Sequence, residues 1–101
     1  MGFRDEKAKV LDCLKKGHFE HDLERHSIDT KNLFGIGLLT TEQVYNAIKK
    51  ARGSDYQTSP HHQITGLNVH IIKYYDTKLR CPWYIKWYYI DPTAFFISVH
   101  H

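Results

Sequence analysis

Two segments near the C-terminus alternate in side-chain character with a period of two residues, which is typical of β-strands. They are residues 83–90 and 94–101, and the residues between them, Asp91, Pro92 and Thr93, are suited to a turn. Successive side chains of a strand point to opposite faces of a sheet. The protein is therefore expected to end in an antiparallel hairpin with one apolar face and one face that carries tyrosine, lysine, serine and histidine.

A three-residue turn sets the register of this hairpin, because it places Ile90 opposite Ala94. Side chains that lie opposite each other on one face are close enough to interact. The predicted pairs on the polar face are Tyr84 with His100, Lys86 with Ser98, and Tyr88 with Phe96.

The length and composition indicate one folded domain, residues 1–101. Hydrophobic residues make up 42% of the sequence and aromatic residues 14%, which is too apolar for a disordered protein. No apolar run approaches 18 residues, and residues 1–16 carry charges throughout, so we expect neither a membrane span nor a signal peptide. The expected location is the cytoplasm. No glycine-rich phosphate loop is present, and we expect no cofactor.

Periodicity and capping residues predict the remaining elements. Residues 5–16 and 41–52 are expected to be helices, and 67–75 a strand, with another strand near 56–64. Residues 22–25 are expected to form a short helix or a turn. The predicted fold class is α+β, with two or three helices packed on one face of a small antiparallel sheet.

The second helix carries the clearest signal, since Thr40 as N-cap and Gln43 three residues later form a capping box. One face of the sheet is then expected to pack on the helices. The predicted core residues are Leu67, Val69, Ile71, Ile85, Trp87, Phe95, Ile97 and Val99 from the sheet, and Leu11, Leu14, Val44 and Ile48 from the helices.

The polar face of the hairpin carries the groups that cleave RNA without a metal. That reaction needs a base for the 2′-hydroxyl, an acid for the leaving 5′-oxygen and a cation near the phosphate. His70 and His100 suit the first two roles, Lys86 the third, and Tyr84 is placed to donate a hydrogen bond or a proton. The alternative is an ordinary solvated sheet face, where tyrosine and lysine are common.

Further residues of the same region are candidates for RNA binding. Tyr88 is suited to stack on bases, and Ser98 lies on the same predicted face. His61 and His62 follow Pro60 and either contact nucleotides or belong to a plain polar loop. The other histidine cluster, around residues 18–26, lacks metal-ligand spacing, and we expect no metal site.

The C-terminal half resembles the MqsR-type toxins of the RelE superfamily. The likeness covers residues 54–101, with a weaker similarity in the helix at 41–52. It is carried by Ser54-Asp55-Tyr56-Gln57, Asn68-Val69-His70-Ile71, Trp83-Tyr84-Ile85-Lys86-Trp87, Ile90-Asp91 and Phe96-Ile97-Ser98-Val99-His100.

This resemblance implies a bacterial toxin that cleaves messenger RNA without a metal and is neutralised by a cognate antitoxin protein. The family's functional tyrosine falls on Tyr84, its glutamine near His70, its C-terminal lysine on His100, and a further lysine near Gln57. Only the tyrosine is retained. The two changes to histidine either move the chemistry to a two-histidine scheme or remove the activity.

The sequence thus predicts a metal-independent endoribonuclease that leaves a 2′,3′-cyclic phosphate. Two rival interpretations stay open. One is a non-catalytic RNA-binding or regulatory module that uses the same face. The other is a protein-interaction domain, such as a phage-type inhibitor, in which that face is buried against another protein.

Overall fold

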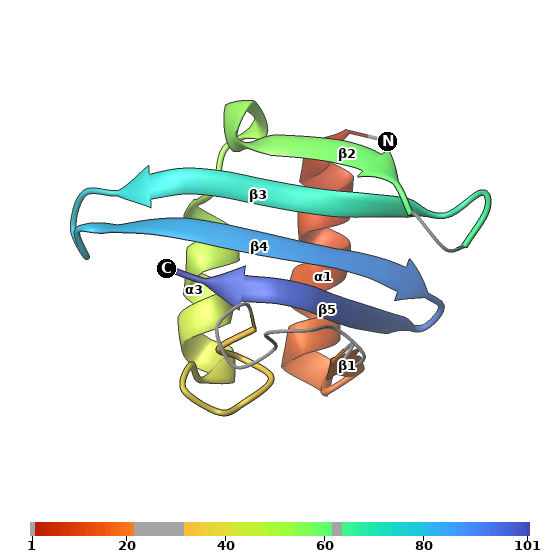
Figure 1. Ribbon diagram of the computed structural model, residues 1–101, viewed down its shortest axis with the longest axis horizontal. Helices are drawn as coiled ribbons and strands as arrows, with labels where there is room; N and C mark the ends of the chain where they lie inside the picture. Colours follow the sequence, from red (N-terminus) through yellow and green to blue (C-terminus); the bar gives the residue numbers. More distant parts are fainter. Residues whose placement is uncertain (1, 22–31, 62–63) are drawn as a thin grey trace.

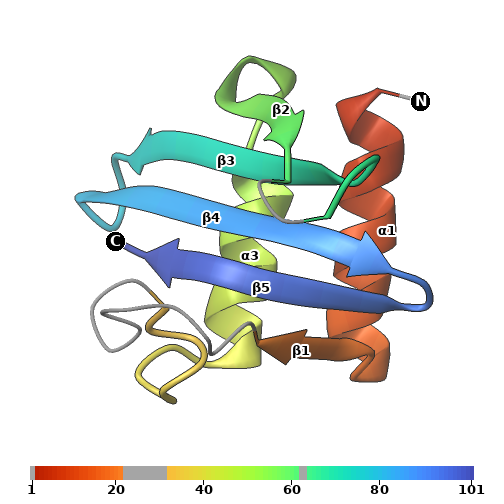
Figure 2. The same ribbon diagram turned by 45° about the vertical axis from the view of Figure 1, so that its right-hand side comes forward.

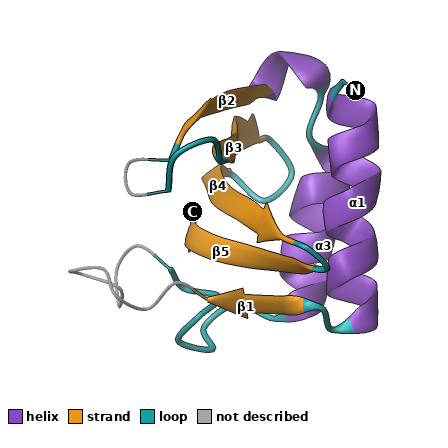
Figure 3. Cartoon of the chain, turned by 90° about the vertical axis from the view of Figure 1, so that its right-hand side faces the viewer, coloured by secondary structure: helices purple, strands orange, loops and turns teal. Residues whose placement is uncertain are grey.

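The computed structural model of the protein describes residues 2–21, 32–61 and 64–101. In sequence order its elements are α1 (Phe3–Lys16), β1 (Phe19–His21), α3 (Thr41–Lys50), the 3-10 helix η1 (Gly53–Asp55), β2 (Tyr56–Pro60), β3 (Asn68–Asp76), β4 (Cys81–Ile90) and β5 (Thr93–His100). The strands form one sheet in the order β1-β5-β4-β3-β2, and α1 and α3 lie on one side of it (Figures 1 and 3). Only β1 and β5 run parallel to each other among these neighbouring strands. The predicted α+β class is confirmed.

The helices begin and end close to the predicted residues. The Gln43 N–H donates to Thr40 Oγ1 (3.1 Å) and the Thr40 N–H to Gln43 Oε1 (2.8 Å), so the predicted capping box is present. Gly17 ends α1 in the left-handed conformation (φ 78°), which costs glycine little because it has no Cβ. No helix in the described ranges is long and apolar enough to cross a membrane.

The main hydrophobic core lies between the two helices and the sheet. Val44 and Ile48 of α3 and Ile85 and Trp87 of β4 are fully buried there. The burial of each such residue stabilises the fold by about 1.5–3 kcal/mol. The predicted core residues found in or against this cluster are Leu11, Leu14, Val44, Ile48, Ile85, Trp87 and Val99.

The hairpin of β4 and β5 keeps the predicted register only in the part far from its turn. There the structure contains the predicted pairs Tyr84 with His100 and Lys86 with Ser98. The register then shifts by one residue, with Ile97 as the extra residue of β5, which defines a β-bulge. The turn is shorter than predicted, because Thr93 belongs to β5 and pairs with Ile90.

The bulge inverts the faces of the residues that precede it in β5. Tyr88 lies opposite Phe95, not Phe96. Phe96 is fully buried beneath the helices, whereas Phe95 and Ile97 pack in a second cluster on the other face of the sheet. The prediction that Phe95 and Ile97 face the helices was wrong, since one extra residue moves a strand's side chains to the opposite face.

Strand β3 is also turned over relative to its prediction. Ile72 is fully buried in the helix-side core, while Val69 and Ile71 pack with Leu67 on the other face. Both sets of alternating positions in this strand contain isoleucine, so the period alone does not say which set faces the helices. The assignment of Leu67, Val69 and Ile71 to the helix-side core was wrong.

The short strand β1 was not predicted. A buried asparagine, Asn32, connects the segment that begins with it to β5. Asn32 is completely buried, donates from Nδ2 to the Phe96 carbonyl (3.2 Å) and accepts the Gly35 N–H at Oδ1 (2.8 Å). A buried side chain of this kind needs such partners to offset its desolvation. The short helix or turn predicted at residues 22–25 lies outside the described residues.

The bulge makes a direct prediction about stability. Phe96→Ala should lower the free energy of unfolding by about 3–5 kcal/mol, because it opens a cavity in the main core. Phe95→Ala truncates a half-buried side chain on the other face of the sheet and should lower the free energy of unfolding by less than about 2 kcal/mol. Urea unfolding of both variants measures the difference. Equal losses, or a larger loss for Phe95→Ala, would contradict the observed register.

Candidate functional site

The sheet face turned away from α1 and α3, the open face, carries most of the predicted functional residues. In Figures 1 and 2 the helices lie behind the sheet and this face is toward the viewer. The strand pairing and the alternation of side chains define it. Its residues on β2 to β5 include Gln57, Val69, Ile71, Lys73, Tyr75, Tyr84, Lys86, Tyr88, Phe95, Ile97, Ser98 and His100.

One row across three strands brings a cation, a phenol and an imidazole together. Lys73, Tyr84 and His100 are cross-strand neighbours on β3, β4 and β5, and we call them the polar row. The Tyr84 and His100 rings stack with centroids 5.1 Å apart, and Lys73 Nζ lies 5.6 Å from the Tyr84 centroid. The pair of Lys86 and Ser98 lies about 7 Å further along the strands. The polar row thus places an ammonium group, a phenol and an imidazole side by side on one face of the sheet.

The other end of the open face is apolar. Tyr88 and Phe95 stack in parallel with centroids 5.3 Å apart, and the His61 ring meets Tyr88 edge-on at 4.9 Å. Tyr88 is only 6% exposed and Ser98 only 3%. Both side chains are therefore almost fully buried and offer little area for contact with a bound molecule.

The remaining predicted RNA-binding residues lie at the edge of this face. Gln57 is exposed on the edge strand β2, opposite Ile71. His61 follows β2, is half-buried and accepts the Ile64 N–H at Nδ1 (3.1 Å). His62 lies outside the described residues.

His70 lies on the opposite side of the sheet from the polar row. It is 8% exposed, faces the helices, and stacks on Trp87 with ring centroids 5.5 Å apart. The prediction that His70 shares one catalytic face with Tyr84, Lys86 and His100 was wrong. The cause is the reversed orientation of β3, which sends Lys73 to the open face in place of His70.

A hydrogen bond with Tyr56 and a nearby carboxylate surround the His70 imidazole in this position. Its Nδ1 lies 2.6 Å from the Tyr56 hydroxyl, and its Nε2 lies 3.6 Å from Glu6 Oε2. Burial lowers the pKa of His70 more than the Glu6 carboxylate raises it, and burial raises the pKa of Tyr56 to about 12. At neutral pH the assigned arrangement is thus a tyrosine hydroxyl that donates to a neutral imidazole.

Sequence reasoning missed Glu6 and Tyr56 as partners of His70, and Lys73 as a member of the polar row. The position of Lys73 could have been found from the sequence. It has the same parity as Val69 and Ile71, so a correct orientation of β3 would have placed it beside Tyr84. Glu6 lies in a helix distant in sequence, and no local pattern points to its contact with β3.

Comparisons with known proteins give no match to a family model, a curated protein or a solved structure. Among the described residues, no group of three or more histidine, cysteine, aspartate or glutamate side chains is arranged to hold a metal ion.

The buried imidazole predicts a pH dependence of stability. Because the pKa of His70 is lower in the folded protein than its ordinary value of 6.5, the unfolded state binds more protons as the pH falls below that value. The contribution of the neutral His70 to folding stability is therefore fully present above pH 6.5 and is lost as the pH decreases below that value. Burial lowers the pKa of His21 as well, which acts in the same direction.

Urea unfolding at pH 7.5 and pH 5.5 tests this expectation. The wild type should lose stability at the lower pH, and His70→Gln should lose less over the same interval. His18→Gln, at an exposed position, is the matched control and should behave as the wild type. An unchanged pH-dependent loss in His70→Gln would contradict the assignment.

Proposed function

We propose that this protein is a metal-independent endoribonuclease that binds single-stranded RNA on the open face. The observation that carries the proposal is the stack of Tyr84 on His100 beside Lys73. A half-exposed imidazole, a phenol and an ammonium group then face the same solvent-accessible space. Aromatic surface and positive charge together are what single-stranded RNA requires of a binding face.

In the proposed reaction, His100 removes the proton from the ribose 2′-hydroxyl. The 2′-oxygen attacks the adjacent phosphorus, the bond from phosphorus to the 5′-oxygen breaks, and the Tyr84 hydroxyl gives its proton to the leaving oxygen. The products are a 2′,3′-cyclic phosphate and a 5′-hydroxyl, and proton exchange with solvent restores both side chains. Lys73 and Lys86 offset the negative charge that builds on the phosphate.

The finer assignment, a toxin of the RelE superfamily of MqsR type, belongs to the same proposal. It is supported by the sequence resemblance over residues 54–101 and is compatible with two helices on one face of a mainly antiparallel sheet. Under it, the substrate is messenger RNA in the bacterial cytoplasm and the partner is a cognate antitoxin protein.

Cleavage of a labelled RNA in the presence of EDTA tests the enzyme proposal. His100→Ala should reduce the cleavage rate by about 10²- to 10⁴-fold, and Tyr84→Phe by about 10²-fold, the range for loss of one general acid or base. The product should carry a 2′,3′-cyclic phosphate, which acid treatment opens to a mixture of 2′- and 3′-phosphates.

Two variants outside the open face serve as controls. His18→Ala removes an exposed imidazole near β1, and Tyr45→Phe removes a half-buried phenol of α3. Both should cleave at the wild-type rate. Full activity in both His100→Ala and Tyr84→Phe would refute the proposed mechanism.

A second candidate function is RNA binding without cleavage. The position of His70 favours it, because only one of the two histidines expected to work as an acid and base pair lies on the open face. The polar row would then hold the phosphate backbone, and exposed aromatic edges would contact the bases.

Salt-dependent binding separates the two candidates. If Lys73 contacts one phosphate, Lys73→Ala should reduce the slope of log K against log salt by about 0.7, the value for one contact to single-stranded RNA. Fluorescence anisotropy of a labelled oligonucleotide measures this slope. Lys49→Ala, at an exposed position on α3, should leave it unchanged. Binding with this slope and no product in EDTA would establish the second candidate.

A further inference from the structure

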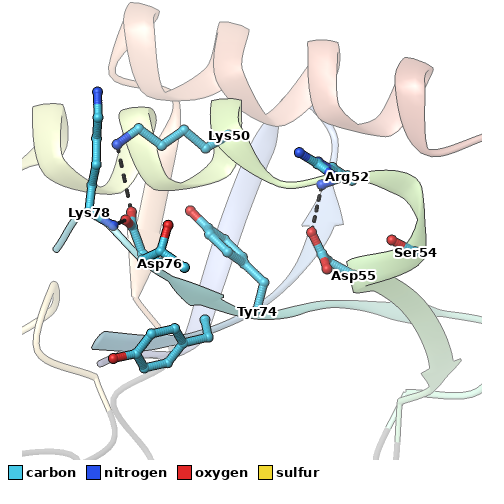
Figure 4. A pocket seen from close by; sticks show the side chains of 9 residues that line it. Lys50, Arg52, Ser54, Asp55, Tyr74, Asp76 and Lys78 are labelled. Carbon is cyan, nitrogen blue, oxygen red and sulfur yellow. Dashed lines mark hydrogen bonds and ion pairs between the residues drawn. The ribbon is translucent and has the colours of Figure 1, made fainter. Parts of the chain in front are cut away.

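A groove lies where the C-terminal end of α3 meets the turn between β3 and β4, and we call it the hairpin groove. It consists of two adjoining cavities of about 640 and 450 Å³, which share Lys50 and Asp76 as lining residues. Arg52, Tyr74 and Lys78 line the larger cavity (Figure 4). Tyr75 also lines it. Each cavity is large enough for an amino-acid side chain and the peptide group beside it.

Two buried polar atoms in this groove lack hydrogen-bond partners among the described residues. They are Trp83 Nε1, in a residue 3% exposed, and Asp76 Oδ2, in a side chain 5% exposed, which lies 3.6 Å from Lys50 Nζ in an ion pair but accepts no hydrogen bond. Trp83 lines the smaller cavity, and Asp76 lines both. A buried donor or acceptor without a partner is costly, so both atoms favour a ligand that supplies an acceptor and a donor. A peptide backbone offers a carbonyl oxygen and an N–H in close succession.

The charges around the groove indicate the side chains of such a ligand. The two aspartates that line the groove already accept hydrogen bonds from the backbone. Asp55 accepts the Arg52 N–H (2.8 Å), and Asp76 Oδ1 accepts the N–H groups of Lys78 and Leu79 (3.0 Å each). The backbone N–H of Leu79 lowers the pKa of Asp76 more than burial raises it, and the Lys50 ammonium lowers it further, so the carboxylate is ionised at neutral pH. Neither the Arg52 guanidinium nor the Lys78 ammonium forms an ion pair with any residue in the described ranges.

Exposed apolar side chains flank the same turn. Tyr75 is 59% exposed and lines the larger cavity, and Leu79 is 60% exposed and lines the smaller one. Both large side chains gain from burial against a partner. The groove therefore combines exposed apolar side chains, two cations that form no ion pair among the described residues, and a buried indole N–H without a hydrogen bond.

We propose that the hairpin groove binds an extended acidic peptide segment of a protein partner. A backbone carbonyl of the peptide accepts from Trp83 Nε1, and a neighbouring N–H donates to Asp76 Oδ2. Acidic side chains of the peptide pair with Arg52 and Lys78, and an apolar one packs on Leu79. This inference concerns a separate surface and does not depend on the nuclease proposal.

The indole N–H signals of the protein's two tryptophans provide the test in the ¹⁵N-labelled full-length protein. The probe is the blocked peptide acetyl-Asp-Leu-Glu-Leu-Asp-amide, compared with its neutral counterpart acetyl-Asn-Leu-Gln-Leu-Asn-amide. The acidic peptide should shift the Trp83 indole signal and bind about tenfold more tightly than the neutral one. The Trp87 indole N–H, which is also buried without a hydrogen-bond partner among the described residues but lies outside the groove, should not move.

Matched variants locate the binding. Lys78→Glu and Leu79→Ser should each weaken the acidic peptide about tenfold. Lys49→Glu on α3 and Leu38→Ser, at an exposed leucine elsewhere, should not. The inference is overturned if the Trp83 signal stays still at millimolar peptide, or if the neutral peptide binds equally well. It is also overturned if a single-stranded oligouridine shifts the Trp83 signal and Lys78→Glu abolishes that shift. The groove would then be a binding site for nucleic acid.

Discussion

The β-bulge at Ile97 is the constraint on which the rest of the structure depends. A hairpin with an unbroken register cannot place both Phe96 and Val99 beneath the helices, because residues an odd number apart point to opposite faces. The extra residue allows this, and the main core closes over both side chains. On the C-terminal side of the bulge the predicted register is kept, so His100 still stacks on Tyr84.

The sheet places His70 and His100 in different environments. His70 lies in the interior, where the hydrogen bond with the Tyr56 hydroxyl (2.6 Å) offsets part of the desolvation of a neutral imidazole. His100 lies on the open face, half-exposed beside Tyr84. Burial lowers the pKa of His70, so this imidazole resists protonation, whereas the imidazole of His100 is accessible to solvent.

The candidate RNA-binding face and the hairpin groove meet at one end of the sheet. Tyr75 lines the groove, and its neighbour on the same face of β3 is Lys73 of the polar row. The β3–β4 turn, which carries Lys78 and Leu79, thus adjoins both sites. A molecule that occupied the groove would therefore lie at the end of the sheet that also carries Lys73.

Tyr84 pairs with His100 as predicted, because the turn is one residue shorter than predicted and the extra residue of the bulge offsets this difference. The sequence by itself determined the α+β class and the capping box at Thr40. Each of these depends on local periodicity or on residues only a few positions apart in a helix or hairpin. Tertiary structure decided which face of β3 meets the helices, because that strand is apolar on both faces. It also decided the bulge, since the choice between Phe95 and Phe96 as the core residue depends on packing against helices distant in the sequence.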